Sequence, residues 1–141
     1  MPDVEPLPEF TLYPLPDQVA DKVCAMYERY GRAAAPSSRY RDLVDLVLIV
    51  VNLELDAGST VTALTAEALR RGMSLPARLG VPGPEWVAGY RAVARDTTLP
   101  SELHEFPSAL LVAGECFNPL LAREIATGVW EPQNRRWRKY S

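Results

Sequence analysis

The chain has 141 residues, of which 48% are hydrophobic and 23% charged, and its formal net charge is −3. This length and composition fit one globular domain that can bury a core without disulfides or a structural metal. The negative charge excludes a uniformly basic nucleic-acid binder, so contact with a polyanion would have to come from a local patch. Cys24 and Cys116 stand far apart, which predicts two buried, reduced thiols rather than a zinc site.

The ends of the chain carry no sign of a membrane or of export. The N-terminus lacks the basic and apolar regions of a signal peptide. The longest purely apolar run covers residues 46–51, whereas a membrane-spanning helix needs ~20 such residues. We therefore expect a cytoplasmic protein with no membrane partner.

The first residues predict an extended segment followed by a helix. Five prolines lie within residues 1–16, and proline fixes φ and removes an amide donor. Residues 1–15 are therefore expected to form an extended lead-in. Apolar residues then recur at helical spacing from Pro16 to Tyr30, and Gly31 follows as a helix stop.

The next segment predicts a central helix over residues 39–53. Ser37 or Ser38 is the expected N-cap, and the middle of the segment is apolar on every side. A helix that is apolar all round is buried on all sides. The β-branched run could also form a strand, but the charged start and the helical spacing favour the helix.

Three further helical regions follow. We expect helices over residues 60–71, ended by Gly72, and over residues 85–96, opened by Pro84. The last region, residues 105–127, is interrupted by a new cap at Asn118-Pro119. The sequence thus predicts an all-α fold of five to six helices in a compact bundle, divided into a lead-in (1–15), a helical domain (16–134) and a basic tail (135–141).

Two carboxylates mark the start of the central helix. Asp42 and Asp45 are three residues apart and share one helix face, and Asp45 stands in an apolar run. A buried carboxylate needs a cationic partner or access to water. Lys22 and Arg29 are seven residues apart on the preceding helix, so an antiparallel pair of helices would bring them to these carboxylates. The cluster could be an ion pair that fixes helix register, or a functional site.

The same residues resemble a known family. Asp21 to Arg29, a short loop, and Arg39 to Leu46 fit the pattern (D)K-x-x-A-x-x-x-R … RD-x-x-D-L of the AbiEii/AbiGii nucleotidyltransferase toxins. The likeness extends from about residue 12 to residue 137. It continues through the following residues: Arg70-Arg71, Pro84-Glu85-Trp86, Tyr90, Asn118-Pro119-Leu120 and Trp130.

The resemblance implies a polymerase-β-like catalytic domain followed by a helical C-terminal domain, of which this chain is similar to the second. Such proteins are toxins of toxin–antitoxin or abortive-infection systems. They use Mg²⁺ and NTP, add nucleotides to tRNA 3′ ends, and have a cognate antitoxin. By motif, Lys22 would contact the nucleotide phosphates, Asp42 or Asp45 would help hold the active site, and Arg29 and Arg41 would position phosphate or the carboxylates.

One part of the family pattern is missing. These enzymes need a Gly-Ser turn followed by two metal-binding carboxylates. Asp3-Val4-Glu5 has the carboxylate spacing without the turn, and Gly58-Ser59 follows Glu54-Leu55-Asp56 in the reverse order. We therefore expect no metal ligands in this chain, and transfer that depends on a missing or separate catalytic domain. The alternative is a non-enzymatic interaction module or an antitoxin-like helical module.

The C-terminal residues offer a second possible contact with RNA. Residues 135–140 hold four cations, Arg135, Arg136, Arg138 and Lys139, together with two aromatic residues. Cations with aromatic rings suit phosphate contact and base stacking. A solvated tail with no binding role is the alternative.

Overall fold

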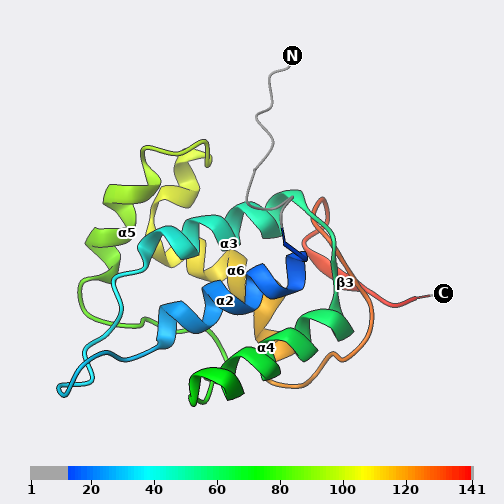
Figure 1. Cartoon of the computed structure of the whole chain (residues 1–141). Helices are drawn as coiled ribbons and strands as arrows, with labels where there is room; N and C mark the ends of the chain where they lie inside the picture. The colour runs from blue at the N-terminus through cyan, green and yellow to red at the C-terminus, as the bar shows by residue number, and fades with distance from the viewer. Residues whose placement is uncertain (1–12, 141) are drawn as a thin grey trace.

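A computed structural model describes residues 13–140 of the chain (Figure 1). It contains five α-helices: α2 (Leu15–Tyr27), α3 (Tyr40–Asn52), α4 (Ala57–Arg71), α5 (Trp86–Ala94) and α6 (Phe106–Leu121). A short 3₁₀ helix, η1 (Ser101–His104), precedes α6. The all-α prediction is confirmed, whereas most of the predicted lead-in lies outside the described residues.

A small antiparallel sheet, which the sequence did not predict, accompanies the helices. Its strands are β1 (Leu55–Asp56), β2 (Val129–Glu131) and β3 (Arg136–Arg138), in the order β1-β2-β3. Leu55 pairs with Trp130, and Trp130 pairs with Trp137. The sheet therefore joins the end of α3 to a hairpin far along the chain.

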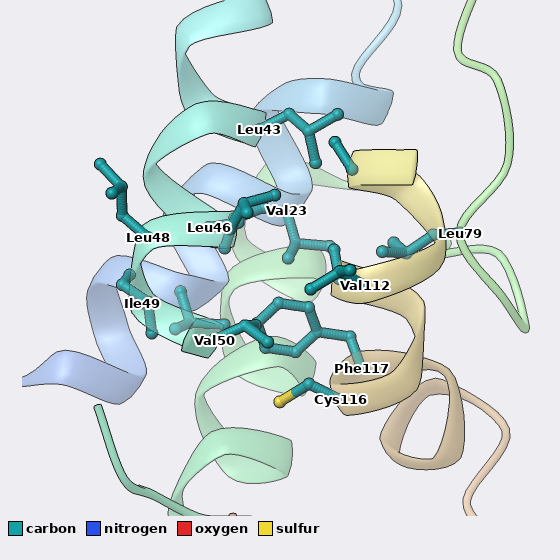
Figure 2. Close-up of a cluster of buried hydrophobic side chains, with 14 of the residues drawn as sticks. Val23, Leu43, Leu46, Leu48, Ile49, Val50, Leu79, Val112, Cys116 and Phe117 are labelled. Atoms are coloured by element: carbon teal, nitrogen blue, oxygen red, sulfur yellow. The ribbon is translucent and has the colours of Figure 1, made fainter. Parts of the chain in front are cut away.

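Helix α3 is the centre of the molecule. Every residue from Asp42 to Val50 is buried, and α2, α5 and α6 all pack against this helix. Figure 2 shows side chains of α3, among them Leu46 and Val50, facing Val112 and Phe117 of α6. The apolar run is therefore a buried helix, as predicted, and not a strand.

Both ends of the α2–α3 connection differ from the prediction. Helix α2 ends at Tyr27 rather than Tyr30, because Glu28 takes an extended conformation, and Gly31 (φ +72°) lies in a turn beyond it. The N-cap of α3 is Arg39, with no side-chain cap. The serine cap was wrong, since Ser37 Oγ instead donates to the Met26 carbonyl at 2.9 Å. Tertiary contacts decide this boundary.

The later helices also differ at their ends. Helix α4 starts at Ala57, where the Asp56 carboxylate accepts from the Ser59 amide, and it ends as predicted before left-handed Gly72. Helix α5 is slightly shorter than predicted at both ends. Helix α6 continues through Pro119, so the predicted interruption at Asn118-Pro119 was wrong. Asn118 Oδ1 does not cap a helix but accepts from the Leu79 amide at 2.7 Å.

The C-terminal hairpin is held to the helices by two indoles. Trp130 Nε1 donates to the Val50 carbonyl of α3, and Trp137 Nε1 donates to the Cys116 carbonyl of α6, each at 2.8 Å. The two rings meet edge to face at 5.6 Å between centroids. Residues 136–138 therefore form a packed strand and not a solvated tail.

Both cysteines are buried and free, as expected. Burial raises the pKa of the Cys24 thiol to about 11, so the group stays protonated at neutral pH. None of the helices in the described part of the chain has the length and apolar character needed to cross a membrane.

Gly128 at the start of the hairpin gives a test of this fold. Its φ is +129°, and a Cβ there would lie 2.7 Å from the Arg138 carbonyl oxygen. We expect Gly128→Ala to lower the free energy of unfolding by about 2 kcal/mol or more, because backbone strain and the steric clash both destabilise the folded state. Gly80→Ala is the matched control, since nothing lies near its Cβ position. Equal urea melts for the two variants would contradict this.

Candidate functional site

Helices α2 and α3 run in opposite directions and bring one lysine between two aspartates (Figure 1). Lys22 Nζ donates to Asp45 Oδ2 at 3.0 Å and lies 3.7 Å from Asp42 Oδ1. The exposed fractions of the three side chains are only 12%, 7% and 8% in that order. The predicted meeting of Lys22 with the two carboxylates is therefore present in the structure.

Two arginines from the first turn of α3 and its N-cap complete the cluster. Arg41 Nε donates to Asp45 Oδ1 at 3.1 Å, and Arg39 Nε lies 3.1 Å from Asp42 Oδ2. The arginine side chains are 60% and 52% exposed respectively. Three cations thus share two buried carboxylates, and the cluster carries a surplus of one positive charge. We call these five residues the α2–α3 charge cluster.

Arg29 does not belong to the charge cluster. Its predicted place depended on a helix that continues two turns beyond Lys22, but α2 ends at Tyr27. Arg29 is exposed, and the ion pairs of Asp42 and Asp45 within residues 13–140 involve other cations. The sequence-based prediction placed the end of α2 at Gly31, whereas the helix ends near Met26, whose carbonyl accepts a hydrogen bond from Ser37.

The two carboxylates are in unequal environments. Asp45 receives two hydrogen bonds, whereas Asp42 Oδ2 is buried without one, since the nearby Arg39 is poorly aligned. Burial raises the pKa of Asp42 above 3.8, although Arg39 and Lys22 act in the opposite direction. Asp45 is therefore the residue that holds Lys22 and Arg41, whereas Asp42, paired with Arg39, is the less well hydrogen-bonded buried charge.

Lys22 lies at the edge of a surface hollow. The hollow has a volume of about 410 Å³, and its lining among the described residues is Tyr13, Asp17, Gln18, Asp21 and Lys22. The carboxylates of α3 are not part of that lining. Arg39 and Arg41 are thus the exposed cations of the site, Lys22 reaches the hollow, and the aspartates are buried.

A second ion-pair network on the other side of α2 was missed from the sequence. Arg71 of α4 contacts Asp21 at 2.6 Å, Glu28 at 2.7 Å and Glu67 at 2.6 Å. Asp21 and Glu28 are seven residues apart, the same spacing as Lys22 and Arg29. The argument that placed those two cations on one helix face would therefore also have predicted an acidic face. These ion pairs link α4 to one face of α2. The face of α2 that carries Lys22 packs against α3.

Three of the four C-terminal cations are paired, two within the hairpin and one with helix α6. Arg136 and Arg138 lie 3.0 and 2.7 Å from Glu131, and Arg135 lies 3.1 Å from Glu115. Hydrogen bonds from Asn134, Arg136 and Arg138 hold the pKa of Glu131 at about 2. Lys139 has no ion pair within the described part of the chain. Two carboxylates therefore balance two of the four positive charges predicted for RNA contact.

The described residues do not fit the Mg²⁺ site that the family resemblance implies. No group of three or more His, Cys, Asp or Glu side chains between residues 13 and 140 is arranged to hold a metal ion. Asp42 and Asp45 are already balanced by three cations, so a divalent cation would meet net positive charge there.

The unequal environments of the carboxylates predict unequal mutational effects. We expect Asp45→Asn to lower the free energy of unfolding by about 2 kcal/mol or more, because it leaves Lys22 without its main partner. Asp42→Asn should change it by less than about 1 kcal/mol, because the amide removes a poorly hydrogen-bonded buried charge. Urea melts at neutral pH measure both, and the reverse order would contradict the assignment.

The sequence comparisons identify the family of this chain. A family model described as "Nucleotidyl transferase AbiEii toxin, Type IV TA system" matches residues 1–112, which include α2, α3 and the whole charge cluster. No curated protein and no solved structure matches the chain. Because the model covers most of the sequence and the residues that form the cluster, the chain belongs to the AbiEii nucleotidyltransferase toxin family of type IV toxin–antitoxin systems.

Proposed function

We propose that this chain is the phosphate-binding helical part of a nucleotidyltransferase toxin that moves nucleotides from NTP to an RNA such as tRNA. Lys22 and Arg41 bind the triphosphate, and Asp42 and Asp45 position them. The observation that supports this proposal is that buried carboxylates hold two exposed arginines and a largely buried lysine. Phosphoryl transfer depends mainly on positioned positive charge, which is what such an arrangement supplies.

The arginines are anchored in a way that suits a phosphate ligand. Arg39 and Arg41 meet their aspartates through Nε. Their terminal Nη atoms make no side-chain hydrogen bond within the described residues, and each side chain is more than half exposed. A guanidinium fixed at Nε keeps its two terminal nitrogens for a fork-like contact with phosphate.

Lys22 can act in the same way, although it is more buried. An ammonium has three donors, of which one is directed to Asp45 and a second lies near Asp42. The remaining donor can serve a phosphate oxygen without separation of the ion pair.

The proposed reaction requires a second part. Two-metal nucleotidyl transfer uses carboxylates that hold Mg²⁺, and the charge cluster does not fit that role. We propose that a polymerase-like catalytic domain, outside the described residues or on a separate chain, supplies them. The helical part then binds and orients the triphosphate, and the cognate antitoxin counters the completed enzyme.

Direct binding of a nucleoside triphosphate tests the proposal. We expect Arg41→Gln to weaken binding of a labelled triphosphate about tenfold, because it removes one charged contact with phosphate. Fluorescence titration of the purified chain measures this. Transfer of label to total tRNA, with Mg²⁺ present, then shows whether the chain is active alone.

The matched control is Arg138→Gln. Arg138 is 46% exposed and is also paired with a glutamate, so it resembles Arg41 in exposure and pairing but lies in strand β3. Triphosphate binding that is equal in wild type and Arg41→Gln, or that falls equally in the control, would overturn the role of the cluster.

A non-enzymatic interaction module is the second candidate, and the burial of the cluster favours it. If Lys22 and the aspartates only fix helix register, Lys22→Met with Asp45→Leu should change the free energy of unfolding by less than about 1 kcal/mol. It should also leave triphosphate binding unchanged. A folded double variant that has lost triphosphate binding would argue against this candidate.

A further inference from the structure

The connection between α2 and α3 concentrates positive charge on an otherwise acidic protein. Residues 28–41 contain four arginines and one glutamate, whereas the whole chain has a net charge of −3. The glutamate, Glu28, is bound to Arg71. The four arginines are all exposed. We define the hairpin patch as Arg29, Tyr30, Arg32, Arg39 and Arg41.

The backbone of this connection has a defined shape. Tyr30 and Ala35 form an antiparallel bridge with hydrogen bonds of 3.0 and 2.8 Å. Gly31 and Ala34 have positive φ values of +72° and +51° within the turn. At its base, Ser37 is bound to Met26 through Oγ. Figure 1 shows the connection projecting from the helical body at the end where α2 stops and α3 begins.

The patch combines unpaired cations with an exposed ring. Arg29 and Arg32 have no ion pair among the described residues, and Tyr30 is 42% exposed although it is a large aromatic side chain. An aromatic side chain among arginines suits a base stacked on the ring and phosphates beside it. The exposed ring of Tyr30 distinguishes this patch from a solvated loop that carries charges alone.

The patch is also continuous with the charge cluster. Arg39 and Arg41 belong to both, and their positions are set by Asp42 and Asp45. An RNA strand on the hairpin would therefore lead toward Lys22 and its hollow. Of the four C-terminal cations, three are paired with Glu115 or Glu131, whereas two of the four hairpin arginines are paired, with Asp42 and Asp45.

We infer that the hairpin patch is the docking surface for a single-stranded RNA end, with Tyr30 stacking on a base and Arg29 and Arg32 contacting phosphates. This inference rests on the proposed function for its link to nucleotide transfer. The RNA binding itself can be measured without nucleotide, so the two proposals can fail separately.

The test is binding of a labelled short single-stranded RNA to the full chain, followed by fluorescence anisotropy over a series of salt concentrations. We expect Arg29→Ser with Arg32→Ser to weaken binding about tenfold and to reduce the slope of log K against log salt by about 1.4, as two lost phosphate contacts require. Tyr30→Ser should weaken binding roughly tenfold through lost stacking, and Tyr30→Phe should restore it.

The matched control is Arg136→Ser with Arg138→Ser, which removes the same charge from strand β3. We expect its salt slope to equal that of the wild type. Arg29→Lys with Arg32→Lys should keep the slope, and thermal melts should confirm that each variant is folded. A wild type that does not bind this RNA, an unchanged slope in the serine hairpin variant, or an equal loss in the control would overturn the inference.

Discussion

The structure depends on the burial of α3 on every side. Nine consecutive residues of this helix, Asp42 to Val50, are buried, so neighbouring elements have to cover its whole circumference. Helices α2, α5 and α6 supply most of that cover, and Trp130 satisfies a carbonyl in its last turn. A helix in this position makes the surrounding elements one cooperative unit, since each of them buries an apolar face against it.

The central position of α3 also explains the character of the site. A carboxylate placed on a buried helix must gather cations around it, and Asp45 does so with Lys22 from α2 and Arg41 from its own helix. Burial of the anion therefore orients the cations above it. The ion pairs that stabilise the two helices can thus also present ordered positive charge at the surface. The structural and functional interpretations of the cluster are therefore compatible.

Much of this arrangement could be predicted from residue spacing, and the failures have definite causes. The buried central helix and the contact of Lys22 with the aspartates follow from periodicity and the cost of burying charge. Helix ends could not be predicted well, because Ser37 and Asn118 make tertiary hydrogen bonds where capping rules expect local ones. The loss of Arg29 from the cluster follows directly from one such end. The strands were missed because segments of two or three residues carry no detectable alternation.

The bond from Trp130 to Val50 spans 80 residues of sequence and therefore bears on the order in which the molecule assembles. On the ribosome, α3 and strand β1 emerge well before the strand that completes them. Until that strand arrives, β1 has no partner for its backbone and the last turn of α3 keeps an open carbonyl. Contacts so distant in sequence form late and slowly. A tryptophan outside the region matched by the family model thus makes one of the contacts that the central helix gains only after most of the chain has been synthesised.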